Sequence, residues 1–308
     1  MERCDVVCIA SWNADLVSRV ARPIARGETV LARSFEISPG GKGSNAAVAC
    51  ARQGARTALV ARIGRDEFGA MALALWAREG LDATHVEQTD GERSGVAQIL
   101  VYDDGDNSIA VAPGAGAGLG AAQIEAARAM LAASRVTMAS CEVPLDAALS
   151  AFRIARAAGV TTLLNPAPAQ PLPDELIRLA DVLTPNETEL RTLAGVTAEA
   201  SPERAAQALL GRGARAVIVT LGAQGCRLWR RDGAAVQLPG WRMPEVVDTI
   251  GAGDTFTGAL AAALARGEAL EEAMRWANAA AALSVTGRGA IGGMPSHAQV
   301  QALLEPGR

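Results

Sequence analysis

Short apolar runs, many rich in β-branched residues, alternate along this chain with Ala- and Leu-rich stretches of helical length. The apolar runs predict buried strands at residues 5–11, 57–63, 136–140, 161–164, 182–184 and 216–220. The other stretches predict helices at residues 44–52, 68–78, 254–265, 270–285 and 296–304. Apolar strands separated by helices form a mostly parallel sheet covered on both faces. We therefore expect an α/β, three-layer fold with a mostly parallel central sheet, as a single domain over residues 1–308.

Two segments interrupt this alternation. Residues 94–102 and 107–112 flank an Asp-Asp-Gly-Asp sequence, which is typical of a hairpin turn. Residues 29–37 form another strand-like run outside the pattern. These segments predict a small sheet at the edge of the main domain, built within about residues 12–38 and 94–112. A lid over a site and an ordinary edge hairpin both fit this pattern.

Composition and charge exclude several classes of protein. The net charge of −4 argues against a nucleic-acid partner, because phosphate binding needs clustered positive charge. The apolar runs are broken within the length of a membrane span, and the charged residues among 1–12 do not fit a signal peptide. The five cysteines are odd in number and include no C-x-x-C pair, so we expect reduced thiols. A cytoplasmic enzyme acting on small molecules, with no membrane partner, fits best.

A single lysine stands among the 29 basic residues of the chain. Lys42 lies in a Gly-Gly-Lys-Gly turn, where the compact ammonium group fits and the planar guanidinium of arginine would not be equivalent. This bias indicates a functional lysine, although chance alone could leave one lysine in the chain.

The most informative segment runs from Asp248 to Gly258. Strand-like residues Val246 and Val247 lead into Gly251-Ala252-Gly253, which opens a helix. The unpaired amides of a helix start attract phosphate oxygens. Asp254 follows in the first helical turn, where a carboxylate can accept the proton of an attacking hydroxyl. An aspartate that only caps the helix is the alternative.

Other catalytic motifs are missing from the sequence. The G-x-x-x-x-G-K-[ST] pattern does not occur. Residues 287–292 match G-x-G-x-x-G, but too little chain follows them for a dinucleotide-binding βαβ unit. His85 and His297 are the only histidines and lie far apart, which argues against Ser-His-Asp and histidine-metal chemistry.

The segment at residues 248–258 resembles the C-terminal signature of the PfkB-type carbohydrate kinases. Residues 40–45 resemble the N-terminal signature of that family, and further matches occur in order and spacing at residues 11–15, 165–169, 184–189 and 220–222. The resemblance covers essentially the whole chain. It implies a parallel α/β domain with a small β-sheet lid, and a kinase that uses ATP and Mg²⁺.

The resemblance also implies which residues hold the sugar. The matching positions are Asn13, Asp15, Gly41, Lys42, Asn45 and Glu142, with Asp254 contacting the sugar as the catalytic base. Short carboxylates and amides suit this task because they form several hydrogen bonds with a polyol. From the residues alone, a turn after the first strand would explain Asn13 and Asp15, and a solvated strand end would explain Glu142.

The same comparison implies a nucleotide site. Asn186 and Glu189 match an N-x-x-E element that organises Mg²⁺ and phosphates, largely through water. A helix-capping arrangement is the alternative for this pair. The remaining nucleotide positions are Thr220, Gly222, Gly225, Gly253 and Asn278, and the anion hole comprises Gly251, Ala252 and Gly253.

A monovalent cation, K⁺, is a further implication of the resemblance. The matching positions are Asp248, Ile250, Ser284, Gly287, Gly289 and Gly293. Gly293 departs from the family pattern, because a hydroxyl residue is common there.

The implied reaction is transfer of the ATP γ-phosphoryl group to the 5-hydroxyl of D-ribose. A different sugar or a nucleoside is the alternative substrate, since Trp12 and Ser44 differ from the commonest residues at their positions. A non-catalytic sugar-binding regulator is a third interpretation, against which the intact Asp254 and Gly-Ala-Gly turn argue.

The predicted lid segments also carry apolar residues that look exposed. These are Val96, Ile99, Val101, Ile109 and Val111. One face of the small sheet can cover the sugar, so we expect the other face to leave such residues in water. Pairing with a second copy removes this cost, and the resemblance implies such lid pairing, so a homodimer is expected.

Overall fold

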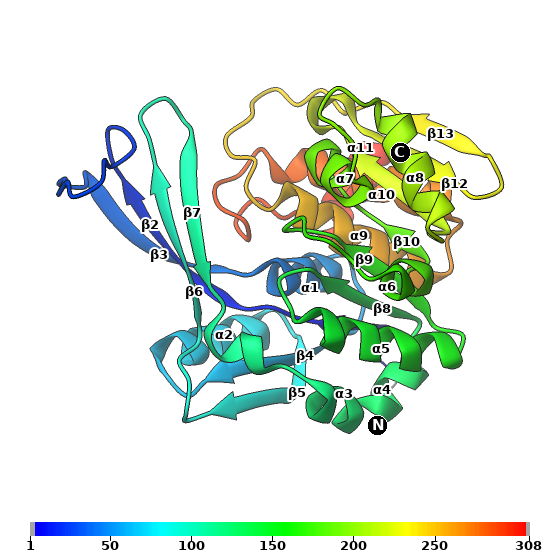
Figure 1. Cartoon of the computed structure of the whole chain (residues 1–308), viewed down its shortest axis with the longest axis horizontal. Helices are drawn as coiled ribbons and strands as arrows, with labels where there is room; N and C mark the ends of the chain where they lie inside the picture. Colours follow the sequence, from blue (N-terminus) through cyan, green and yellow to red (C-terminus); the bar gives the residue numbers. More distant parts are fainter. Residues whose placement is uncertain (1–3, 306–308) are drawn as a thin grey trace.

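A nine-stranded, mostly parallel sheet forms the centre of the protein, as predicted (Figure 1). The computed structural model describes residues 4–305, so the ends of the predicted domain over 1–308 lie outside the described residues. The strand order is β13-β12-β11-β10-β9-β8-β1-β4-β5, and only the β11–β12 and β12–β13 pairs are antiparallel. The strands are β1 (Val6–Ile9), β4 (Thr57–Gly64), β5 (Asp82–Thr89), β8 (Val136–Ser140), β9 (Thr161–Asn165), β10 (Val182–Leu183), β11 (Ala216–Thr220), β12 (Cys226–Arg230) and β13 (Ala235–Leu238).

Helices cover both faces of this sheet and give the three predicted layers. One face carries α1 (Lys42–Arg52), α2 (Glu67–Arg78), α9 (Ala252–Arg266), α10 (Leu270–Ser284) and α11 (His297–Leu304). The other face carries α3 (Ala121–Ala126), α4 (Arg128–Ala133), α5 (Leu145–Ala157), α6 (Asp174–Leu179), α7 (Glu187–Ala194) and α8 (Pro202–Gly211). Side chains of β1 alternate between the two cores, with Val6 and Cys8 on the α1/α9 side and Val7 and Ile9 on the other.

Three strands of the central sheet were not predicted from the sequence. Strand β5 lies at one edge and is only half-buried, so its polar residues hide the apolar signal. Strands β12 and β13 pair antiparallel at the opposite edge, outside the strand–helix alternation. The predicted strand at 182–184 shortens to β10, and the predicted helix at 44–52 begins two residues earlier, at Lys42.

A separate four-stranded sheet, here called the lid sheet, projects from the main body (Figure 1). Its order is β3-β2-β6-β7, formed by β3 (Ser34–Gly40), β2 (Asn13–Arg19), β6 (Gly95–Val101) and β7 (Asn107–Ala112). The predicted strand at 29–37 is therefore displaced. Ser34 pairs with Arg19, the last residue of β2, so residues 29–33 run beyond the partner strand and do not form one.

The pairing register of the lid sheet corrects the prediction about its apolar faces. Asp15 lies opposite Ala97, and Ala97 lies opposite Val111, so these side chains share one face. By the same register Ile99, Val101 and Ile109 lie on the face of Asp15, whereas Val96 lies on the other face. Ile99 is also buried rather than exposed, at 8%.

The strand-like pair Val246 and Val247 is not a strand. The amide of Val247 donates to the carbonyl of Val285, just after α10, and none of the strands within residues 4–305 pairs with it. Within residues 4–305, none of the helices has both the length and the apolar character needed to cross a membrane.

Candidate active site

Helix α9 begins at the Gly-Ala-Gly turn, as the sequence predicted. Gly251 precedes the helix with φ 78°, a left-handed conformation that favours glycine. A side chain at Gly251 would also meet Ala290, whose Cα lies 2.8 Å from the position of an added Cβ. Asp254 is the third residue of α9 and is only 6% exposed. The carboxylate therefore lies beside the amides of the first turn.

Helix α1 begins at Lys42, and residues far along the chain cap its start. Gly41 has φ 89° and contributes no side-chain cap. The Lys42 amide instead donates to Glu142 Oε2 at 2.8 Å, and the Gly43 amide donates to Ser11 Oγ at 3.0 Å. The Ser11 hydroxyl in turn donates to Glu142 Oε2 at 2.8 Å. Glu142 and Ser11 thus fix the turn that presents Lys42.

Ser11 was not among the predicted site residues. Its only signal in the sequence was its place at the start of the motif at residues 11–15.

The structure brings the predicted sugar-binding residues together. Asn13 Nδ2 lies 3.5 Å from Glu142 Oε2, and Asn45 Nδ2 donates to Asp254 Oδ2 at 2.9 Å. Asp15 follows on the same face of β2 as Asn13. The set gathers where the first turns of α1 and α9 meet the base of the lid sheet, and comprises Asn13, Asp15, Gly41, Lys42, Asn45, Glu142 and Asp254.

Burial and mutual repulsion perturb the carboxylates of this cluster. Burial, followed by the charges of Glu142 and Asp254, raises the pKa of Asp15 to about 7. Burial also raises the pKa of Asp254 to about 6, although the Lys42 charge and the Asn45 hydrogen bond oppose this rise. The negative charge of Asp254 is in turn the largest cause of a raised pKa for Lys42. Perturbed carboxylates around one cation are typical of a functional site.

A cavity of about 620 Å³ adjoins the start of α9. Six predicted residues line it: Thr220, Gly222, Gly225, Ala252, Gly253 and Asn278. The lining also includes residues that the sequence did not indicate, among them Trp241, Arg242, Met243, Phe256, Ala281 and Ala282. Asn278 Nδ2 donates to the Pro239 carbonyl at 2.9 Å, so it also anchors the segment that carries Trp241.

Asn186 and Glu189 form the capping arrangement that the sequence left open. The Glu189 amide donates to Asn186 Oδ1, and the Asn186 amide donates to Glu189 Oε2, both at 2.8 Å. The backbone of Asn186 also forms an isolated parallel β-bridge with Thr220, which lines the cavity. The charge of Glu189 still reaches Asp254 and Lys42, whose pKa values it raises. Within residues 4–305, no group of three or more His, Cys, Asp or Glu side chains could hold a metal ion without other ligands.

Two loops, one before α9 and one after α10, carry the residues matched to a monovalent cation, except Ser284, which ends α10. Asp248 joins them, because its carboxylate accepts the amides of Ile250 and Gly289, each at 2.9 Å. A Cβ added at Gly293 would lie 2.0 Å from the Ser284 carbonyl oxygen and 3.5 Å from that of Gly287. These carbonyls converge on Gly293, so the backbone leaves no room for the hydroxyl side chain that is common at this position in the family.

The sequence pattern of the pfkB family carbohydrate kinases matches residues 3–297, and the chain belongs to this family. It is 38% identical over 305 residues to a ribokinase of Haemophilus influenzae, with 98% of this chain and 99% of that protein covered. It is also 34% identical to a deoxyribokinase of Salmonella typhi, with coverage of 97% and 98%. The structure of Arabidopsis thaliana ribokinase complexed with ribose and ATP aligns with a TM-score of 0.91 and 31% identity, covering 98% of this chain and 99% of that one.

Proposed function

We propose that the protein transfers the γ-phosphoryl group of ATP to the 5-hydroxyl of D-ribose. The observation that carries this proposal is the position of Asp254. Its side chain contacts the sugar-binding residue Asn45, and it lies in the first turn of α9, which adjoins the nucleotide cavity. The relatives named ribokinase, and the ribokinase structure with ribose and ATP, support ribose and ATP as the substrates.

Asp254 acts as the general base. The sugar oxygen attacks the γ-phosphorus, its proton passes to the Asp254 carboxylate, and the bond to the bridging oxygen breaks to release ADP. The amides of Gly251, Ala252 and Gly253 stabilise the charge that develops on the transferred group. Lys42 keeps Asp254 in its ionised form and orients the acceptor within the cluster.

Magnesium fits the residues on the phosphate side. One carboxylate oxygen of Glu189 accepts the Asn186 amide, and the charge of Glu189 acts on Asp254. A carboxylate in this position suits Mg²⁺, which keeps most of its water ligands and is bound largely through them. Glu189 and Asn186 would hold the hydrated ion. When bound, Mg²⁺ would neutralise charge on the phosphate oxygens.

A potassium site between the two loops is also part of this proposal. Asp248 and the carbonyls converging on Gly293 supply oxygen atoms, which suit an alkali cation. The residues that would hold it are Asp248, Ile250, Ser284, Gly287, Gly289 and Gly293. Ala290, which follows Gly289 in the second loop, lies close to Gly251 at the anion hole.

A substrate panel tests the proposed reaction. ADP release should be followed with ribose, 2-deoxyribose, fructose and adenosine, in potassium chloride and in choline chloride. We expect kcat/KM for ribose to exceed that for 2-deoxyribose by at least about 10²-fold, because a site that bonds a hydroxyl rejects the analogue lacking it. A preference for 2-deoxyribose or adenosine would assign the other substrate class.

The lid sheet supports a homodimer. Phe35 and Ile37 on one face are 60% and 48% exposed, and Ile109 and Val111 on the other are 56% and 48% exposed. Covering such residues with a second copy removes apolar surface from water. We also propose that the protein acts in the cytoplasm, where its five cysteines would stay reduced.

Light scattering at micromolar concentration should give twice the mass of one chain. Replacing Ile109 with lysine should shift the protein toward the monomer, since the charge would be buried in the interface. A monomeric wild-type protein with full activity would contradict the dimer.

A further inference from the structure

A direct contact joins Asn45, which the resemblance assigned to the sugar, to Asp254, the predicted catalytic base. Asn45 Nδ2 donates to Asp254 Oδ2 at 2.9 Å, and each residue is more than nine-tenths buried. An amide nitrogen can only donate and a carboxylate oxygen can only accept, so the contact fixes the orientation of both groups. One oxygen of Asp254 is thereby engaged, which leaves the other for the acceptor hydroxyl.

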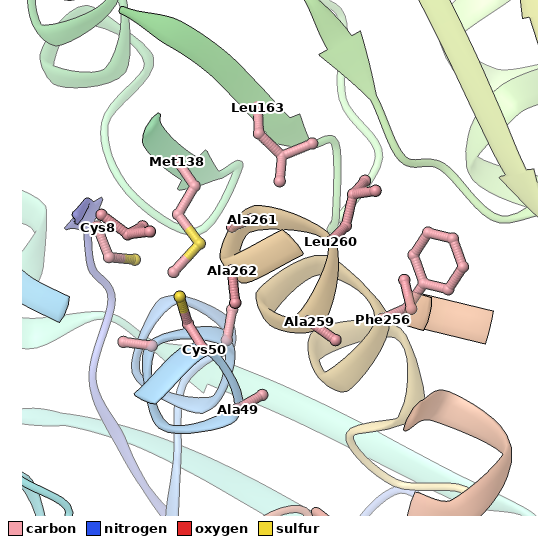
Figure 2. Packing of buried hydrophobic residues seen from close by; sticks show 14 of the residues in the cluster. Cys8, Ala49, Cys50, Met138, Leu163, Phe256, Ala259, Leu260, Ala261 and Ala262 are labelled. Atoms are coloured by element: carbon pink, nitrogen blue, oxygen red, sulfur yellow. The ribbon is translucent and has the colours of Figure 1, made fainter. Parts of the chain in front are cut away.

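The close crossing of α1 and α9 brings the two residues of this contact together. At Gly258 the helices are so close that an added Cβ would lie 2.2 Å from the Ala46 carbonyl oxygen and 2.8 Å from Ala49 Cβ. Figure 2 shows the small side chains of this crossing, with Cys50 of α1 beside Ala262 of α9. A crossing packed backbone to backbone has little freedom to slide. The backbones of α1 and α9 therefore place Asn45 and Asp254 within hydrogen-bond distance of each other.

The second amide atom of Asn45 is unsatisfied. Asn45 Oδ1 is buried and has no hydrogen-bond partner in the described part of the chain, a condition that costs about 1–3 kcal/mol. Rotating the amide would turn this acceptor toward the Asp254 carboxylate, so the contact with Asp254 keeps Oδ1 unpaired. A sugar hydroxyl can donate to Oδ1, and such a bond would strengthen the Nδ2 bond to Asp254 by polarising the amide.

We propose that Asn45 is a positioning residue that orients the Asp254 carboxylate and links sugar binding to the base. This role rests on the proposed function and adds to the sugar contact implied by the family resemblance. Sugar bound at Oδ1 tightens the hold on Asp254 Oδ2, so the base is best ordered when the acceptor is present.

The contact also favours the ionised form of the base. Burial raises the pKa of Asp254 to about 6, and the Asn45 hydrogen bond is among the influences that lower it. The other titratable groups that act on Asp254 belong to five different segments, and they are Lys42, Cys8, Asp15, Glu142 and Glu189. Removing the Asn45 amide leaves these groups in place, so a change in the titration of Asp254 would report on the contact itself.

Asn45→Ala and Asn13→Ala form a matched pair for the test. Both remove an asparagine assigned to the sugar, but only Asn45 touches Asp254. In Asn45→Ala we expect the acidic limb of the pH profile of kcat to move to higher pH by about one unit, because the hydrogen bond that lowers the pKa of Asp254 is lost. Asn13→Ala should raise KM for ribose and leave that limb in place. An unmoved acidic limb in Asn45→Ala, with only KM raised, would overturn the proposal.

A second measurement needs no turnover. The carboxyl carbon of Asp254 can be titrated by NMR without substrates, using Asp254→Asn to assign the signal. Its midpoint should rise in Asn45→Ala and stay in place in Asn13→Ala; an unchanged midpoint in Asn45→Ala would reject the contact. A raised midpoint in a protein without ribose phosphorylation would support the contact and reject the proposed function. If Asn45→Ala does not fold, the isosteric Asn45→Asp should raise the midpoint by placing a second carboxylate there, and no rise would refute the proposal.

Discussion

Asp254→Asn is expected to lower turnover by about 10²- to 10⁴-fold, the usual contribution of a positioned base. The amide keeps the shape of the carboxylate but cannot accept the proton of the sugar hydroxyl. Sugar and nucleotide should still bind, since the variant leaves the rest of the cluster and the cavity lining in place. Single-turnover assays and calorimetry on the purified variant separate these effects. Near-normal turnover would remove Asp254 from the role of base.

The same variant is expected to be more stable than the wild type at pH 8. Burial raises the pKa of Asp254 in the folded protein to about 6, from the ordinary value of 3.8 for an aspartate. Ionisation therefore costs folding free energy, and this cost is complete above pH 6 and disappears below about pH 4. Asparagine carries no such cost. The gain in Tm should be largest at pH 8 and vanish near pH 4, and a gain independent of pH would point to another cause.

The buried elements of this fold were predictable because their signals are local. Strands such as β1 and β11 are apolar on both faces, and the Gly-Ala-Gly turn and Asp254 lie within one short segment. Strand β3 was displaced because its limits depend on the partner strand β2 and not on its own residues. Edge strands such as β5 carry too few buried residues to be detected.

The contacts that complete the candidate site had no local signal. Asn45 and Asp254 lie 209 positions apart, and Lys42 and Glu142 lie 100 positions apart. Their meeting depends on the packing of α1 against α9 and on the order of strands in the sheet. The lining residue Trp241 reaches the cavity through a loop that Asn278 anchors, which no motif describes. Family resemblance named many of the residues, but only the fold shows which of them touch.

Gly253→Ala should abolish most of the activity of a protein that folds as well as the wild type. Gly253 lies in the first turn of α9 and its φ is not left-handed. Apart from its own helix backbone and its chain neighbours, an added Cβ meets no atom of residues 4–305 within 4 Å. Alanine at such a position should raise stability by about 0.5 kcal/mol, because it restricts the unfolded chain. Gly251 offers no such test, since a side chain there would be strained and would meet Ala290.

The open space around Gly253 is the cavity assigned to the nucleotide. A methyl group there would hold the transferred phosphate away from the amides, and losing such a donor costs about 10²- to 10³-fold in turnover. Gly211→Ala is the matched control, because Gly211 ends helix α8, is not left-handed and also has free space around an added Cβ. It should show the same small gain in Tm with unchanged turnover. If Gly253→Ala kept full activity as well, the phosphate would have to bind elsewhere than at the start of α9.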